Sequence, residues 1–152
     1  MEPRLKYWAE APELIKAFVA LNDTIEGSGL DKTLMHLVKL RASQINGCAF
    51  CIDMHTREAR ADGETEQRLY LVSAWHDSFL YSDRERAALQ WTEALTRLAD
   101  HAPDDALFAA TQAQFPGEEI VKLTAIITMI NTWNRLSVAF RAVHAAPRPE
   151  AA

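Results

Sequence analysis

Residues 46 to 55 read NGCAFCIDMH and hold both cysteines of the 152-residue chain, Cys48 and Cys51, with His55 four residues after the second. The Asn-Gly pair predicts a helix stop followed by a new helix, because both residues tolerate the backbone angles that such a junction needs. The cysteines open this new helix. At about 100° per residue, Cys48, Cys51 and His55 fall within an arc of about 60°, so both sulfurs and the imidazole share one helix face.

Three physical properties of this stretch favour redox chemistry. A thiol in the first turn of a helix meets exposed N–H groups and the positive end of the helix dipole, which stabilise a thiolate. His55 lies one turn after Cys51 and is placed to accept its proton. Two cysteines spaced C-x-x-C can form a disulfide, so an oxidised sulfur can be resolved by its neighbour. The stretch therefore predicts a reversible two-electron centre.

Two other interpretations of the cysteines stay open. A structural zinc site needs four ligands, and a fourth would have to come from the remaining histidines, which are His36, His76, His101 and His144. The second pair of ligands at short spacing, which such sites usually have, is missing, and this counts against zinc. Cysteines also serve as small buried apolar residues, although they seldom come with a histidine in helical register.

The sequence on both sides of this stretch predicts an all-α fold. Helical spacing of apolar residues, together with cap residues, gives about six to seven helices, over residues 12–25, 31–45, 48–61, 64–75, 82–98, 103–115 and 118–143. Asp31 is placed to cap one helix, and Ser82 to Glu85 form a capping-box pattern. We expect a single domain over residues 1–152, with a frayed tail at 145–152, where two prolines occur.

Composition narrows the range of partners. The chain has 16 basic and 21 acidic residues and a formal charge of -5, without a block of lysine or arginine, so we expect no nucleic-acid partner. The amino terminus carries charges throughout, and the longest apolar region, residues 120–133, is too short and too polar to span a membrane. We therefore expect a cytoplasmic protein, in which a C-x-x-C pair is more often catalytic or metal-binding than a permanent staple.

The run LVKLRASQINGCAFCIDMHTREAR, residues 37–60, resembles the signature of the AhpD-like alkylhydroperoxidases of the carboxymuconolactone decarboxylase superfamily. The resemblance continues through SAW at 73–75, SDRERAALQWTEALT at 82–96 and INTWNRL at 130–136, and so covers most of the chain. It implies an all-helical fold that assembles into homo-oligomers, either trimers or hexamers. It also implies a peroxidase that reduces organic hydroperoxides or hydrogen peroxide, needs no bound cofactor or metal, and is restored by an external thiol or disulfide reductant.

The same resemblance assigns roles to the residues of the motif. It implies that Cys51 is the cysteine that reacts with peroxide, that Cys48 resolves the oxidised sulfur, and that His55 takes part in a proton relay. The local structure does not decide which cysteine is the nucleophile. The helix dipole favours Cys48 as the more acidic thiol, whereas His55, one turn away, favours Cys51. We follow the pairing with His55 and expect Cys51 to be the nucleophile.

One position departs from the family pattern. Members commonly carry a glutamate twelve residues before the first cysteine, where it completes the relay, and this chain has His36 there. A histidine, with an unperturbed pKa of about 6.5, can pass a proton near neutral pH, but it does not supply a negative charge. The alternative is that His36 is a partly buried helix residue with a backbone or water partner.

Other polar and aromatic residues have competing interpretations. Trp75 and His76 either line the pocket or anchor the packing. Residues 131, 134 and 135, in NTWNR, interrupt an apolar helix, and we expect them to bond to helix caps or a neighbouring subunit rather than to substrate. Asp53 and Arg57 have the spacing of a solvated ion pair, and His101 and His144 have the positions of surface residues.

The leading functional hypothesis is thus a thiol peroxidase that uses Cys51, Cys48, His55 and His36. A second hypothesis is the lactone-decarboxylating lyase activity that gives the superfamily its name, although those decarboxylases generally lack the cysteine pair. A third is a non-catalytic module whose dithiol senses oxidation and changes the binding of a partner.

Overall fold

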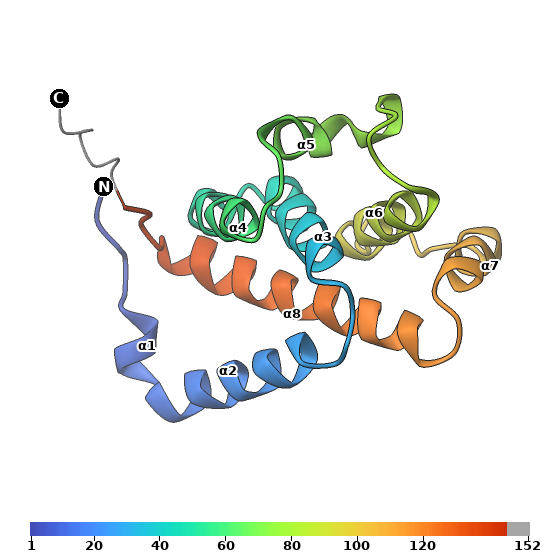
Figure 1. The fold of residues 1–152 in the computed structure, drawn as a ribbon. Coiled ribbons are helices and arrows are strands. Elements are labelled where there is room, and N and C mark those ends of the chain that lie inside the picture. The colour runs from blue at the N-terminus through green and yellow to red at the C-terminus, as the bar shows by residue number, and fades with distance from the viewer. Residues whose placement is uncertain (146–152) are drawn as a thin grey trace, which may run out of the picture.

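The computed structural model describes residues 1–145, and all regular structure within them is helical. The elements, in chain order, are α1 (Tyr7–Glu10), α2 (Pro12–Glu26), α3 (Lys32–Ile45), α4 (Ala49–Ala61), α5 (Glu66–Leu71), the 3-10 helix η1 (Val72–Asp77), α6 (Asp83–Thr96), α7 (Asp105–Gln114) and α8 (Glu118–Phe140). Figure 1 shows α3 in the middle of the molecule with α4, α6 and α8 around it. The predicted all-helical class is confirmed. The tail predicted to fray lies, from residue 146 on, outside the described residues.

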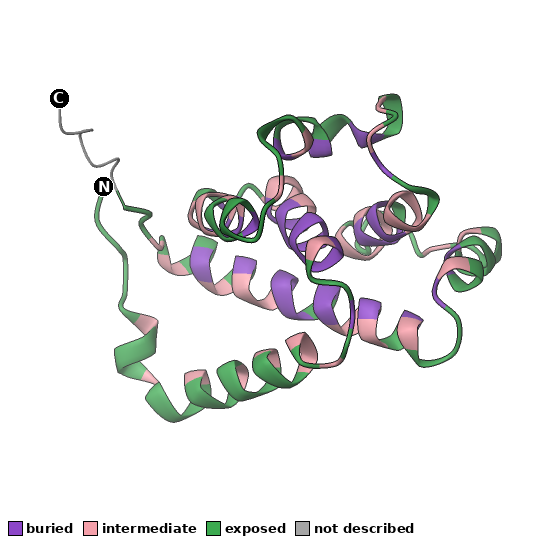
Figure 2. Ribbon diagram, in the orientation of Figure 1, coloured by how far each residue is buried: buried purple, intermediate pink, exposed green. Residues whose placement is uncertain are grey.

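Helix α3 joins the two hydrophobic clusters of the core. Leu34 and Val38 belong to the cluster shared with α6 and α8, whereas Leu37 and Leu40 belong to the cluster shared with η1 and α6. Nine of the fourteen residues of α3 are buried, and Figure 2 shows this concentration of burial at the centre. A helix buried on nearly every side must find partners for any polar residue that it carries.

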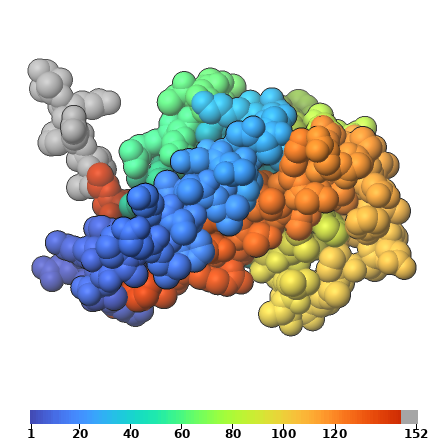
Figure 3. Space-filling model, turned by 90° about the horizontal axis from the view of Figure 1, so that it is seen from below, coloured from blue at the N-terminus to red at the C-terminus, as the bar shows by residue number. Residues whose placement is uncertain are grey.

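Helix α2 has no buried residue and is attached mainly through α8. Figure 3 shows the segment containing α1 and α2 lying along α8. The indole of Trp133 donates a hydrogen bond to Oδ1 of Asn22 at 3.1 Å and makes an edge-to-face contact with Phe18. These contacts hold α2 as the outer wall of a cavity whose inner wall is formed by α3 and α4.

The predicted helix boundaries around the cysteine stretch are confirmed. The carboxylate of Asp31 accepts a hydrogen bond from the backbone N–H of Leu34 at 2.9 Å, and so caps α3. Asn46 is the C-cap residue of that helix, and Gly47 follows with a φ of 65°, a conformation that favours glycine. Farther on, Ser82 and Glu85 form the predicted capping box of α6.

The single helix predicted over residues 64–75 is wrong in its second half. The structure has α5 followed by η1, with a kink at Ala74, where φ is -119°. The guanidinium of Arg86 donates to the backbone oxygen of Trp75 at 3.1 Å and to that of His76 at 3.0 Å. Because a side chain of α6 binds these carbonyls, a tertiary contact overrides the helical tendency of the local sequence.

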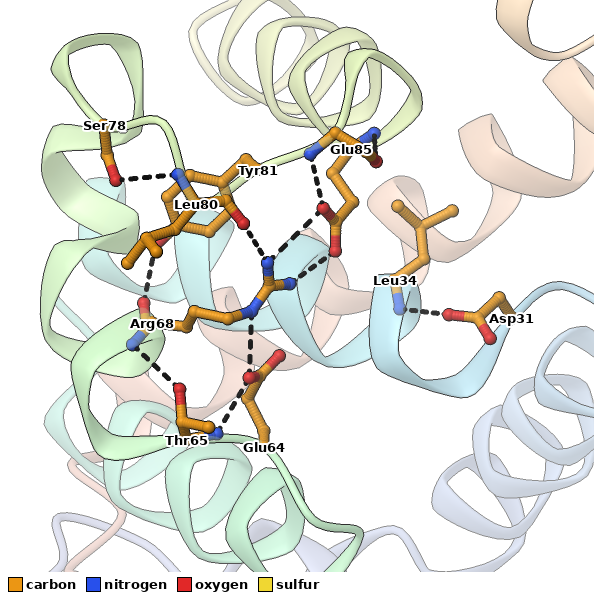
Figure 4. A network of polar contacts seen from close by, with 10 residues as sticks. Asp31, Leu34, Glu64, Thr65, Arg68, Ser78, Leu80, Tyr81 and Glu85 are labelled. Carbon is orange, nitrogen blue, oxygen red and sulfur yellow. Dashed lines mark hydrogen bonds and ion pairs between the residues drawn. The ribbon is translucent and has the colours of Figure 1, made fainter.

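Helix α5 is held onto α6 by a partly buried charged network around Arg68 (Figure 4). Its guanidinium donates to Glu64 at 2.9 Å and also pairs with Glu85 at the start of α6. The hydroxyl of Tyr81 donates to the backbone oxygen of Arg68 at 2.6 Å. This network fixes the chain just after α4, because the N–H of Glu64 also bonds to the oxygen of Ala59 at 2.9 Å.

Helix α8 begins as predicted but ends at Phe140, a few residues before the predicted end near residue 143. The next residue, Arg141, has a left-handed backbone with a φ of 57°, and the N–H of Ala142 turns back to the oxygen of Ser137 at 2.8 Å. This arrangement closes the last turn. In residues 1–145 no helix, α8 included, is long and apolar enough to cross a membrane.

Candidate active site

The two cysteines lie at the amino-terminal end of α4 and are joined as a disulfide, with their Cα atoms 5.3 Å apart. Cys48 is the N-cap residue, and its Sγ accepts a hydrogen bond from the backbone N–H of Cys51 at 3.3 Å. A cap position normally holds a hydroxyl or carboxylate oxygen. Here the sulfur of Cys48 takes that place, so a backbone N–H in the first turn of α4 stabilises it.

Helix α8 fixes the junction that precedes the cysteines. The side-chain N–H₂ of Asn46 donates to Oδ1 of Asn131 at 3.0 Å and to Oδ1 of Asn134 at 2.8 Å. Asn134, which is buried, donates in turn to Oγ of Ser43 at 3.0 Å. The expectation that the asparagines of α8 bind a helix cap is confirmed, and the cap that they bind is the one that sets the start of α4.

Cys51 lines a cavity of about 820 Å³ between α2, α3 and α4, whereas Cys48 is not among the residues that line it. Both residues are buried, Cys51 at 1% and Cys48 at 2% exposure. The apolar part of the wall consists of Tyr7, Val19, Leu30, Met35, Phe50, Met54, Ala61 and Trp133. A molecule that enters this cavity therefore meets Cys51 first.

His55 lines the same cavity one helical turn after Cys51. Its Nδ1 lies 3.0 Å from a carboxylate oxygen of Glu58. Because an ionised carboxylate only accepts hydrogen bonds, Nδ1 carries the hydrogen, and in the neutral imidazole the other ring nitrogen is then an acceptor. That nitrogen, Nε2, is buried, and no group within residues 1–145 hydrogen-bonds to it. The hydrogen bond from His55 lowers the pKa of Glu58, outweighing the effect of burial.

His36 is buried on α3 and also lines the cavity. Its Nε2 lies 2.6 Å from a carboxylate oxygen of Asp62, and the other oxygen of Asp62 accepts from Lys32 at 2.8 Å. Lys32 and His36 together lower the pKa of the Asp62 carboxyl group. The partner of His36 is thus a carboxylate, which neither sequence interpretation named. Asp62 lies eleven residues beyond Cys51, or about 16 Å along the helix axis, so this pair occupies the end of the cavity away from the thiols.

Sequence reasoning missed Glu58 and Asp62. With Cys51 and His55 they follow the spacing i, i+4, i+7, i+11, which is one stripe of a single helix face. This spacing was the signal that could have found them. A second missed pair is Lys39 of α3, whose side chain is only 9% exposed, and Glu26 of α2, which form an ion pair on the cavity wall.

Several residues considered from the sequence lie elsewhere. Trp75 is buried and donates from Nε1 to Glu93 at 2.9 Å, and His76 stacks on its ring at 3.5 Å between centroids. Both line a separate cavity of about 360 Å³, so the packing interpretation of Trp75 holds. Asp53 and Arg57 form the expected ion pair at 3.0 Å, and His101 and His144 are exposed. In the part of the chain that the structure describes, no three His, Cys, Asp or Glu residues form a group suited to a metal ion.

Comparisons with known proteins agree with this architecture. The sequence profile of the carboxymuconolactone decarboxylase family matches residues 12–94. The uncharacterized protein YdfG of Bacillus subtilis (strain 168) is 42% identical over 139 residues, which cover 91% of this chain and 95% of that protein. A second relative is a crystal structure from Agrobacterium tumefaciens, of a protein of unknown function suggested to be the antioxidant defence protein AhpD. That protein is 46% identical to this chain, and the two structures superpose with a TM-score of 0.93 over 96% of this chain and 100% of that one. The debrominase Bmp8 shares the fold at 22% identity, with a TM-score of 0.81 over 91% of this chain and 74% of that one.

Proposed function

The chain belongs to the carboxymuconolactone decarboxylase family and is AhpD-like, and from this membership and the geometry of the site we propose that it is a thiol peroxidase. One observation carries the proposal. Cys51 lines the cavity beside His55, whose buried Nε2 is free to accept a proton. A nucleophile, a base in helical register with it and a resolving thiol at disulfide distance are the three groups that such a reaction needs.

In the reduced protein, Nε2 of His55 takes the thiol proton of Cys51. The thiolate attacks the terminal oxygen of a hydroperoxide, the O–O bond breaks, and Cys51 becomes a sulfenic acid. The leaving alkoxide, or hydroxide when the substrate is hydrogen peroxide, takes a proton from the imidazolium and departs as an alcohol or water. The sulfur of Cys48 then displaces water from the sulfenic acid, which gives the Cys48–Cys51 disulfide.

An external thiol or disulfide reductant of the dithiol class closes the cycle. It attacks Cys51, because this is the sulfur that lines the cavity. Cys48 is then the leaving group, and the N–H of Cys51 that bonds to its sulfur stabilises the departing thiolate. A second thiol of the reductant releases Cys51. The helix start therefore assists Cys48 as the leaving group, and the cavity makes Cys51 the sulfur that peroxide and reductant reach.

The charges on the cavity wall fit a neutral substrate. Two lysines and three carboxylates line it, namely Lys32, Lys39, Glu26, Glu58 and Asp62, and most of the remaining wall is apolar. Such a surface gives an anion no net attraction, whereas hydroperoxides are neutral near pH 7. We propose that the substrate is an uncharged organic hydroperoxide or hydrogen peroxide. His36 lies at the far end of the cavity, bonded to Asp62, and the proton step proposed here does not pass through it.

A peroxide titration with counted thiols tests the proposal. Reduced wild-type protein should consume one equivalent of cumene hydroperoxide and lose both thiols. Cys48→Ser should still consume one equivalent but stop at a sulfenic acid that dimedone traps, whereas Cys51→Ser should consume none. The matched control is His101→Asn, which alters an exposed histidine. Reduced wild-type protein that consumes no hydroperoxide, or a Cys51→Ser variant as fast as wild type, would contradict the proposal.

The same samples separate the alternatives. A lyase of the kind that names the family would release carbon dioxide from a muconolactone whether or not the cysteines are present. A redox-sensing module would form its disulfide slowly and would not turn over with a reductant. In either case the His36→Glu variant is informative, because a large gain in turnover would mean that the natural chain is not primarily a peroxidase.

We also propose that the protein is a homo-oligomer, either a trimer or a hexamer. Large apolar side chains are exposed on and next to the helices of the outer wall, namely Leu5, Trp8, Leu14, Val19 and Leu21. Another subunit that covered them would remove this surface from water. Light scattering on the purified protein should give three or six times the 17.1 kDa chain mass, and a monomer or a dimer would contradict the proposal.

A further inference from the structure

The chain lacks a carboxylate at position 36, yet the base of the proposed mechanism is bound to one. The partner of His55 is Glu58, from the next turn of the same helix, at 3.0 Å. His36 is bound to Asp62 instead, so its imidazole is engaged elsewhere in the cavity. We infer that Glu58 is a positioning residue that acts through His55 and takes the place of the carboxylate missing from position 36. This inference rests on the proposed role of His55 as the base for Cys51.

Glu58 has two physical effects on His55. It accepts the hydrogen of Nδ1, which leaves the buried Nε2 as the acceptor facing the chemistry. It also stabilises the imidazolium that forms when His55 takes the proton of Cys51, because an anion beside a cation lowers its energy. Removing the negative charge while keeping the hydrogen bond should therefore shift formation of the Cys51 thiolate to higher pH.

Glu58 also connects the buried base to solvent. The side chain of His55 is 7% exposed, whereas that of Glu58 is 48% exposed. The proton taken from Cys51 stays on Nε2 until the leaving alkoxide accepts it, and between turnovers the buried imidazole can exchange its Nδ1 proton with water through the exposed carboxylate. The relay of this chain thus runs along one face of α4 and does not need a carboxylate on α3.

Other charged groups surround His55 and Glu58, and most of them are paired with one another. The titratable residues of the cavity wall, apart from Cys51, His55 and Glu58, are Tyr7 of α1, Glu26 of α2, Lys32, His36 and Lys39 of α3, and Asp62 after α4. Lys39 is paired with Glu26, and Asp62 with His36 and Lys32. Helix α8 contributes the uncharged side chains of Trp133 and Ser137. Among the residues that the structure describes, Glu58 is therefore the carboxylate in direct contact with His55.

The test measures the thiolate of Cys51 without peroxide. In a Cys48→Ser background, the rate of alkylation by iodoacetamide is followed against pH, and Glu58→Gln is compared with Asp62→Asn. Glu58→Gln should raise the midpoint by about 0.5 to 1 unit and slow alkylation at pH 7 by about three- to ten-fold, the lower figure reflecting solvent screening of a half-exposed carboxylate. Asp62→Asn, which removes a carboxylate from the same stripe one turn farther on, should leave the midpoint unchanged.

A rescue variant sharpens the result. Glu58→Gln combined with His36→Glu should return the midpoint toward that of the parent, since it restores a carboxylate where family members commonly have one. An unchanged midpoint in Glu58→Gln, or an equal shift in Asp62→Asn, would overturn the inference. Alkylation needs no peroxidase turnover, so a failure here is distinct from a failure of the proposed function, which the peroxide titration measures. Glutamine has the shape of glutamate and this side chain is half exposed, so we expect the variant to fold.

Discussion

Replacing Asn46 with alanine should destabilise the protein and disturb the redox site together. The change removes the donor for two side-chain oxygens, those of Asn131 and Asn134. The oxygen of Asn131 keeps a hydrogen bond from Arg135 at 3.2 Å, so the loss there is an ordinary one of about 0.5 to 1.5 kcal/mol. Asn134 is 1% exposed, and its oxygen would be left buried without a donor, which costs about 1 to 3 kcal/mol. The expected loss of unfolding free energy is therefore about 1.5 to 4.5 kcal/mol.

Urea unfolding followed by circular dichroism measures this loss directly, as a lower midpoint with an unchanged slope. The matched control is Gln44→Ala at the same helix end, where a single long contact with Arg41, at 3.5 Å, should cost far less. A double-mutant cycle of Asn46→Ala with Asn134→Ala should show a coupling energy of at least about 1 kcal/mol. A loss for Asn46→Ala no larger than that for Gln44→Ala would refute the reasoning. The surviving Asn46→Ala protein should also react more slowly with peroxide, because the start of α4 is less well held.

Three further predictions concern parts of the fold away from the thiols. Trp75→Phe should lower the free energy of unfolding by about 1 to 2 kcal/mol through loss of the hydrogen bond to Glu93. The rate of reaction with peroxide should stay at the wild-type value, since Trp75 does not line the active cavity. A large loss of rate would count against this prediction. Ser82→Ala should lower the unfolding free energy by about 1 kcal/mol, measured in urea, because it breaks the capping box of α6. Burial raises the pKa of Tyr81 from its usual value of about 10 to about 12. The stability that this neutral hydroxyl contributes is fully present below pH 10 and should fall by about 2 to 3 kcal/mol as the pH rises to about 12. In Tyr81→Phe this part of the alkaline loss should disappear.

The local signals in the sequence were enough to predict most of the helices. The capping box at Ser82 and the Asn46-Gly47 junction are short patterns with one dominant physical meaning, and both occur as predicted. The break between α5 and η1 was missed because its cause is Arg86, which lies outside the segment and reaches it only in the folded chain.

The candidate site was likewise predictable from the sequence only in part. Helical geometry alone placed Cys51 and His55 together, and the same rule, carried two turns farther, would have added Glu58 and Asp62. The partner of His36 could not be found so simply. Asp62 is 26 residues away in the sequence, and the two side chains meet because α3 and α4 pack against each other.

The placement of Cys48, Cys51, His55 and Glu58 along a single helix has a mechanical consequence. A helix that is capped and hydrogen-bonded throughout moves as a rigid rod on the timescale of small fluctuations. When α4 tilts or slides against its neighbours, the distances between nucleophile, base and carboxylate stay nearly constant. What varies is the gap between α4 and the wall formed by α2 and α3. Small fluctuations of the fold thus leave the distances between the reacting groups nearly unchanged. The same fluctuations change the cavity volume that is available to a bound molecule.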